Sequence, residues 1–152
     1  MTKQEIRNNT HLSLMKAFPH AAHTGEYALR AVYTDDLLET NEQVTIDVRV
    51  DEDGVARFSF SKPVKIKPKA CKEIQLYLNR VRDRSEDKIT RAELMNNGRL
   101  LVMETWMEQT DSGWLDVETI ESFYFKSVGF LITLSFSFSW LDQLAAARKN
   151  DL

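Results

Sequence analysis

The sequence has few of the residues that build covalent or metal-bound frameworks. Its 152 residues include one Cys, three His, three Pro and five Gly. The single cysteine, Cys71, excludes an internal disulfide and a cysteine-based zinc site. The formal net charge is only −3, which gives no overall reason to expect nucleic acid or an acidic membrane as a partner. We find no catalytic motif and therefore expect neither enzymatic activity nor a cofactor.

The composition is that of a compact domain, with 43% hydrophobic and 28% charged residues. A chain of this length buries roughly 68–70% of the surface that its unfolded form exposes, enough for a core without disulfides or a metal. We therefore expect one domain over residues 1–152. The start, Met1–Glu5, lacks the apolar run of a secretory signal, so we expect a cytoplasmic protein.

The N-terminal half is predicted to contain one helix and three strands. Thr2 and Glu5 have the spacing of a capping box, which predicts a first helix that ends at about Phe18, before a proline. Alternating apolar residues predict strands over Gly25–Thr34, Val44–Val50 and Ala56–Phe60. The turn residues Asp51–Gly54 join the last two of these strands in a hairpin.

The next segment is predicted to hold a helix and a second hairpin. Apolar residues spaced three and four apart predict a helix over about Lys69–Arg84. The pair Asn97-Gly98 separates two β-rich runs, which is a strong hairpin signal. The two strands are expected over Ile89–Met95 and Arg99–Gln109, and Asp111–Gly113 turns the chain again.

A final helix completes the predicted fold. Asp116 can cap it, and it runs from Val117 to about Lys149, with Gly129 as the place where it could bend. The predicted order is helix, three strands, helix, two strands, helix. This order indicates an α+β fold in which helices pack on a small antiparallel sheet.

The strand that begins at Arg99 is apolar on both faces. A sheet covered by helices on one side normally shows polar residues on the other, so one set of residues on this strand needs a second cover. That cover could be the final helix, a second subunit or a bound polypeptide. The candidate partner or dimer interface consists of Leu100, Leu101, Val102, Met103, Trp106 and Met107.

The segment Phe123–Leu141 is long and apolar, with Lys126 as its one charge. Its nineteen residues would be long enough to cross a membrane. Five hydroxyl-bearing residues between Ser127 and Ser139 favour instead a helix buried in the protein or shared across a dimer. A tail anchor remains the alternative.

Three further features, the histidines, the cysteine and a basic segment, are not expected to carry chemistry. His20 and His23 are too few for a metal site, and we expect no bound metal. Cys71 lies on the apolar face of its helix, where a thiol behaves as a small hydrophobe. The segment Lys62–Arg84 has six more positive than negative charges but one aromatic residue, Tyr77. It is therefore interpreted as a solvated or docking surface, and nucleic acid is not the expected partner.

With this order of elements, the chain resembles the bacterial fold shared by class I type III secretion chaperones and the YbjN-like sensory transduction regulators. The resemblance extends over about Gly25–Leu144. The segments that carry it are Gly54-Val55-Ala56-Arg57-Phe58, Tyr77-Leu78-Asn79, Asn97-Gly98-Arg99-Leu100-Leu101-Val102 and Gly113-Trp114-Leu115-Asp116.

The resemblance implies a small α+β domain that forms a homodimer and binds a partner polypeptide without catalysis. Binding would use apolar surface or strand addition at a free sheet edge. Two other functions remain open. One is a small ligand-binding or enzymatic domain, which would need a cavity with converging polar groups. The other is a tail-anchored protein, which would use residues 123–141 as its anchor.

Overall fold

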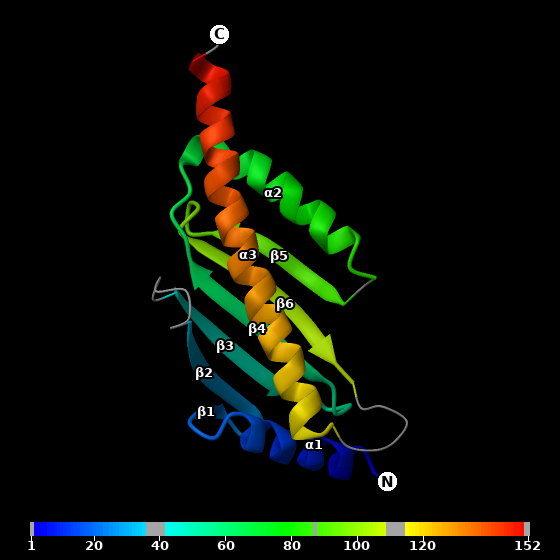
Figure 1. The fold of residues 1–152 in the computed structure, drawn as a ribbon. Coiled ribbons are helices and arrows are strands. Elements are labelled where there is room, and N and C mark those ends of the chain that lie inside the picture. The colour runs from blue at the N-terminus through cyan, green and yellow to red at the C-terminus, as the bar shows by residue number, and fades with distance from the viewer. Residues whose placement is uncertain (1, 36–41, 87, 109–114, 151–152) are drawn as a thin grey trace.

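The computed structural model describes residues 2–35, 42–86, 88–108 and 115–150. Within these residues the chain forms three helices and one antiparallel six-stranded sheet, which confirms the α+β class (Figure 1). The strands are ordered β1-β2-β3-β4-β6-β5 across the sheet. The elements are α1 (Lys3–Ala17), β1 (Ala22–Gly25), β2 (Ala28–Asp35), β3 (Glu42–Val50), β4 (Ala56–Pro63), α2 (Pro68–Asp83), β5 (Ile89–Met95), β6 (Leu100–Met107) and α3 (Val117–Asn150).

The expected strand count is wrong by one, because a short strand precedes β2. β1 pairs with β2 at the edge of the sheet, and the turn between them brings Gly25 opposite Ala28. All four residues of β1 are exposed, so no apolar alternation marks it in the sequence. The first predicted strand therefore begins at Ala28 rather than at Gly25.

The predicted helix starts are confirmed by their capping contacts. The Thr2 hydroxyl accepts a hydrogen bond from the Glu5 backbone N–H at 3.1 Å. The Asp116 carboxylate accepts one from the Thr119 N–H at 2.6 Å and so caps α3. α3 is one helix over Val117–Asn150, with Gly129 in its interior. The turn predicted at Asp111–Gly113 lies outside the described residues.

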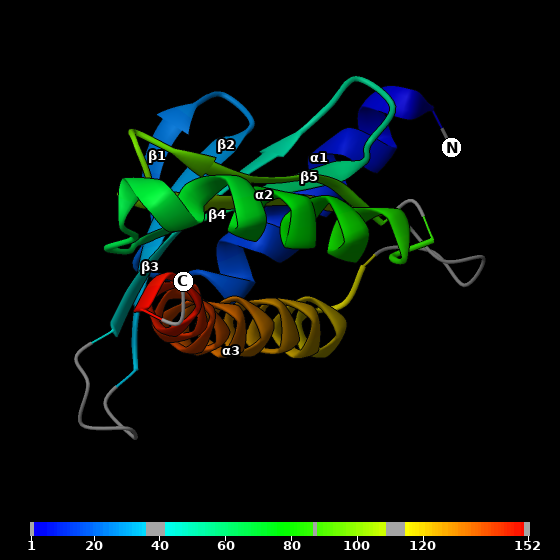
Figure 2. The same cartoon turned by 90° about the horizontal axis from the view of Figure 1, so that it is seen from above.

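α2 and α3 lie on the same face of the sheet, which we call the inner face (Figure 2). α1 lies across one end of the sheet, beside the β3–β4 turn (Figure 1). The core fills the space between the inner face and these helices. Its largest fully buried side chains include Phe58, Phe60, Met103, Ile74, Leu78, Leu131 and Phe138.

The two apolar faces of β6 have different surroundings. Leu101, Met103 and Met107 lie on the inner face, in register with Phe60 and its neighbours on β4. Leu100, Val102 and Trp106 lie on the opposite, outer face. Because α3 packs against the inner face, it does not cover the outer residues.

α3 is buried along one side within the single chain. Ile120, Val128, Leu131 and Phe138 belong to the core, which agrees with the interpretation of residues 123–141 as a buried helix. No helix within the described residues combines the length and apolarity that a membrane crossing requires.

Candidate functional site

A groove of about 680 Å³ lies on the inner face, between the first half of α3 and strands β5 and β6. α2 and α3 lie near each other at one end of the sheet and diverge toward the other (Figure 1). The residues that line the groove belong to the first half of α3 and to β5 and β6. We call it the α3–β6 groove. Its apolar lining is Ile89, Met103, Met107, Phe123 and Phe130, its hydroxyl groups come from Thr105, Thr119, Ser122 and Ser127, and its charged residues are Lys88, Asp116, Glu118 and Lys126.

The regular periods of the two elements place these side chains in one groove. On β6, residues 103, 105 and 107 alternate with the outer residues and all face inward. On α3, Thr119, Phe123, Lys126 and Phe130 are spaced three or four apart and share one side of the helix. The Asp116 cap fixes where this helix begins. The hydrogen bond from the Thr119 N–H lowers the pKa of Asp116, so the carboxylate is held in its charged form.

The groove has the length of a short peptide. Met103 and Met107 are four strand residues apart, which spans about 13 Å. Thr119 and Phe130 are eleven helical residues apart, which spans about 16 Å. A groove of this length accommodates about four or five residues of an extended chain.

Thr105 provides a polar group on the otherwise apolar floor. Its side chain is 94% buried, and its hydroxyl oxygen has no hydrogen-bond partner among the described residues. Buried hydroxyl groups in proteins are almost always hydrogen-bonded, because a missing bond costs about 1–3 kcal/mol. The Thr105 hydroxyl oxygen is itself buried, so it lies beneath the surface of the groove and not at it.

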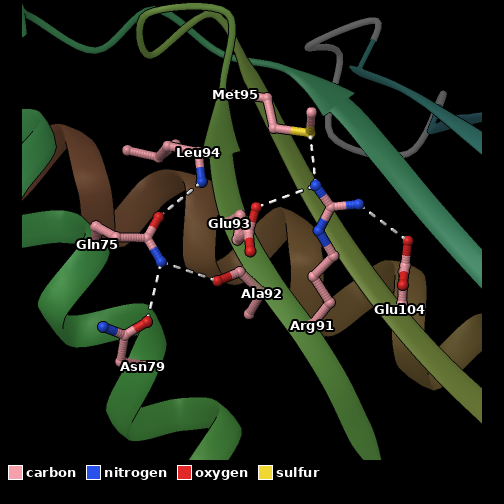
Figure 3. Close-up of polar contacts among 8 residues, drawn as sticks. All are labelled: Gln75, Asn79, Arg91, Ala92, Glu93, Leu94, Met95 and Glu104. Atoms are coloured by element: carbon pink, nitrogen blue, oxygen red, sulfur yellow. Dashed lines mark hydrogen bonds and ion pairs between the residues drawn. The ribbon is translucent and has the colours of Figure 1, made fainter.

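The edge of the sheet beside the groove is blocked by a side chain from α2. The Gln75 amide donates a hydrogen bond to the Ala92 carbonyl at 3.1 Å and accepts one from the Leu94 N–H at 2.9 Å (Figure 3). These are two of the outward-facing backbone groups that an added strand would use. The Gln75 amide also donates to the Asn79 side chain at 3.0 Å, which holds it in place. Strand addition at the middle of β5 would have to displace this contact.

The outer face of the sheet carries ion pairs. The Arg91 guanidinium lies 3.0 Å from the Glu93 carboxylate and 3.3 Å from that of Glu104 (Figure 3). Arg30 and Asp47 form a pair at 2.7 Å on the other half of the same face. Partly exposed ion pairs of this kind remain hydrated and contribute little to stability. Much of the outer face is therefore a polar surface.

The candidate interface residues on β6 are divided between the two faces. Leu101 and Met103 are at most 2% exposed, so they belong to the core of the single chain. Met107 lines the α3–β6 groove. On the outer face, Val102 is buried between its cross-strand neighbours Ser61 and Glu93 without any helix above it. The expectation that one whole face of β6 needs a second cover is therefore wrong for Val102, because neighbouring side chains cover it.

The histidines form a different arrangement from the one that the sequence suggested. His23 lies beside His11, with 6.2 Å between the ring centroids, and His11 also contacts Tyr27. His20 is exposed in the turn after α1. Among the described residues, no group of three or more His, Cys, Asp or Glu side chains could hold a metal ion. Cys71 is half-buried on α2, and its thiol faces Gly98 in the β5–β6 turn.

One lysine of the basic segment lies inside the protein. Lys62 is on the inner side of β4, where its neighbours Phe58 and Phe60 also point, and it is 3% exposed. The assignment of the whole of Lys62–Arg84 to a solvated surface is therefore wrong at this position, because strand alternation directs Lys62 inward.

Sequence reasoning identified β6 as unusual but not the groove beside it. Comparisons with protein-family models, curated protein sequences and solved structures found no match to this chain. The groove residues that could not be identified from the sequence include Thr105, Ser127 and Phe130. The available signal was the combination of a two-faced apolar strand with a hydroxyl-rich apolar helix, since two such elements line a groove when they do not cover each other fully.

Proposed function

We propose that this chain is a non-catalytic protein-binding module that holds a segment of a partner polypeptide in the α3–β6 groove. The observation that carries the proposal is the apolar surface that the protein's own helices leave open. Phe130 on the wall of this groove is 39% exposed, and Phe123 and Met107 are partly exposed beside it. Contiguous exposed apolar surface of this kind is typical of binding sites.

The methionines support a polypeptide ligand. Met103 and Met107 are unbranched and polarisable, so they adapt to side chains of different shapes. Burying one apolar side chain of a partner contributes about 1.5–3 kcal/mol. Two such anchors would contribute about 3–6 kcal/mol, so further contacts along the groove would be needed to offset the cost of association.

The two edges of the sheet differ in how far they are open to strand addition. Gln75 occupies backbone groups of Ala92 and Leu94 on β5. At the opposite edge, β1 pairs with β2 only as far as Arg30, and β2 continues to Asp35 beyond it. We place the partner segment in the groove, because the groove offers burial of apolar side chains in addition to polar contacts.

The resemblance to class I type III secretion chaperones and YbjN-like proteins implies the same class of function. Homodimer formation and a cytoplasmic location belong to this proposal as well. The outer-face residues Leu100 and Trp106, both partly exposed, are the part of the predicted dimer interface that remains accessible. α3 lies on the inner face, so it does not form one continuous surface with them.

The proposal can be tested with random twelve-residue peptides displayed on phage and selected against the full chain. Peptides recovered by selection are synthesised with a fluorescent label, and their affinity is measured by fluorescence polarisation. Phe130→Ser removes an apolar wall of the groove and should weaken binding about tenfold or more. Phe136→Ser is the matched control, because Phe136 is exposed on the same helix but outside the groove.

Failure to enrich any peptide, or an equal effect of both substitutions, would overturn the proposal. Enrichment with an effect confined to Phe130 would support it. If peptides fail and a small amphipathic probe such as anilinonaphthalene sulfonate binds in a manner sensitive to Phe130→Ser, the groove is a small-ligand site instead.

A further inference from the structure

One edge of the sheet is open along the second half of β2. β1 pairs with β2 only as far as Arg30, and β2 continues to Asp35 (Figure 1). Among the described residues, no strand pairs with β2 beyond Arg30 on the side away from β3. We call this segment, residues 31–35, the β2 edge.

The backbone groups that this edge presents belong to Val32 and Thr34. The Val50 N–H donates a hydrogen bond to the Tyr27 carbonyl at 2.9 Å, which makes these two residues a hydrogen-bonded pair at the start of the β2–β3 ladder. Such pairs alternate along an antiparallel ladder, so odd-numbered residues of β2 direct their N–H and C=O groups toward β3. The even-numbered residues Val32 and Thr34 therefore direct theirs toward the open edge.

The β2 edge lacks the features that protect edge strands from pairing with other copies, which include lysine, proline and β-bulges. Residues 31–34 have the sequence Ala-Val-Tyr-Thr, without charge or proline, and their register with β3 is regular. The Val32 side chain is 59% exposed. At the opposite edge, by contrast, the Gln75 side chain occupies backbone groups of β5. The protein thus protects one edge and leaves the other open to a strand.

An apolar pocket of about 190 Å³ lies beside the β2 edge on the inner face. It is lined by residues 17–21 at the end of α1, by residues 31–33 and Ile46 on the sheet, and by Tyr124 on α3. A cavity of about 150 Å³ holds a benzene molecule, so this pocket has room for one aromatic side chain. A strand added to β2 would direct alternate side chains toward the inner face and thus toward the pocket.

We propose that the β2 edge pairs with the β2 edge of a second copy, antiparallel and about a twofold axis, so that the two sheets become continuous. An axis perpendicular to the sheet places Val32 of each copy opposite Thr34 of the other. Each pair can then exchange both of its N–H···O bonds, because the backbone groups of both residues face the edge. This inference rests on the homodimer included in the proposed function, and it assigns the interface to β2 instead of the outer face of β6.

The side chains at the β2 edge favour a second copy as the added strand. The axis places Tyr33 of the second copy opposite Tyr33, on the inner face and beside the pocket, which has room for its ring. Phe125 is exposed on α3, and its ring centroid lies 6.0 Å from that of Tyr33, so it extends the apolar surface beyond the pocket. Residues 31–34 carry no charge, so the pairing opposes no like charges. One patch, used twice, thus covers itself.

Val32→Pro tests this pairing, because proline removes the outward N–H and places its ring at the edge. The fold should tolerate it, since the Val32 N–H takes no part in the β2–β3 ladder. Light scattering over about 10–300 µM protein should give a dimer mass for the wild type at the upper concentrations and a monomer mass throughout for Val32→Pro. Val32→Thr is the matched control, because threonine keeps the N–H and the β-branched shape, and it should behave as the wild type does.

Amide hydrogen exchange of the wild-type protein gives a second test that needs no substitution. The N–H groups of Val32 and Thr34 bond across the proposed interface, so they should exchange about fivefold or more slowly at about 300 µM than at about 10 µM. The N–H groups of Ala31 and Tyr33 bond to β3 within one chain. Their exchange should be the same at both concentrations.

The outcomes separate this interface from the rest of the proposed function. A wild type that is monomeric throughout would overturn the interface and the homodimer, whereas peptide binding in the α3–β6 groove is measured independently with Phe130→Ser. A dimer that persists in folded Val32→Pro, or that is lost equally in Val32→Thr, would show that β2 main-chain pairing does not form it. If Val32→Pro does not fold, the exchange measurement decides: rates at Val32 and Thr34 that do not depend on concentration would overturn the inference.

Discussion

His11 lies on the side of α1 that faces β1 and the following turn, near the rings of His23 and Tyr27. Burial, together with the positive charges of His23 and Arg7, lowers the pKa of His11 below its ordinary value of about 6.5. Its Nδ1 atom is buried and has no hydrogen-bond partner among the described residues. The packing of α1 against β1 therefore favours the neutral ring.

The lowered pKa predicts a loss of stability in mild acid. Near pH 6.5 the unfolded chain begins to bind a proton at this site while the folded chain does not, so stability falls as the pH falls through this range toward the folded-state pKa. The Tm should decrease between about pH 7.5 and about pH 5.5, and His11→Gln should reduce the slope. His20→Gln, in the exposed turn after α1, is the control. Equal slopes for wild type and His11→Gln would contradict this prediction.

Gln75 offers a second residue-scale prediction, because one amide side chain satisfies two backbone groups of an edge strand. Gln75→Leu removes the hydrogen bonds to Ala92 and Leu94, and net losses of about 0.5–1.5 kcal/mol for each bond predict a destabilisation of about 1–3 kcal/mol. Urea unfolding measures this change. The Leu94 amide should also exchange faster with solvent in the variant.

The free edge created by Gln75→Leu should also promote association between copies, measured as light scattering that rises with concentration. Gln75→Glu serves as a comparison, because it keeps an acceptor for the Leu94 N–H but sets a carboxylate against the Ala92 carbonyl. Unchanged stability and unchanged exchange at Leu94 in Gln75→Leu would show that the contact does not protect the edge.

At the scale of elements, two glycines have opposite roles. Gly98 ends the β5–β6 turn with φ +83°, and a Cβ there would lie 2.7 Å from the Cys71 sulfur and 3.0 Å from the Ile66 carbonyl. Gly129 lies inside α3, where a Cβ would meet nothing within 4 Å. Gly98→Ala should destabilise the fold by about 1–3 kcal/mol. Gly129→Ala should stabilise it by about 0.5–1 kcal/mol, since alanine favours the helix. Urea unfolding measures the free energy of unfolding of both variants. Changes of the same sign would contradict the prediction that the turn requires glycine at position 98 and the helix does not require it at position 129.

The elements that the sequence predicted well are those with regular apolar alternation and strong end signals. β3, β4 and α2 were recognised from their periods, and Thr2 and Asp116 marked helix starts by their capping chemistry. β1 could not be predicted because its residues are exposed and have no apolar period. The two apolar elements that line the α3–β6 groove stand out in the sequence, but the groove itself could not be located, because it depends on the angle between α2 and α3 and local patterns contain no information about that angle.

At the scale of the whole molecule, the two faces of β6 can be tested separately. Met103→Glu places a carboxylate in the core and should unfold the chain. Trp106→Glu and Leu100→Glu change the outer face and should leave the chain folded. If the outer face of β6 forms the proposed homodimer interface, light scattering at micromolar concentration should give a dimer mass for the wild type and a monomer mass for the outer-face variants. A monomeric wild type, or variants that stay dimeric, would exclude this interface.

The position of α3 in the chain also affects how the protein is made. α3 follows all six strands, so the ribosome completes the sheet before it synthesises the helix that packs on Phe58 through Phe123. At about 5–20 residues per second, the 34 residues of α3 require about 2–7 s. During this interval the inner face of the sheet can have the cover of α2 but not that of α3. Its exposure to misfolding during synthesis therefore depends on the order of its elements, and not only on the stability of the finished fold.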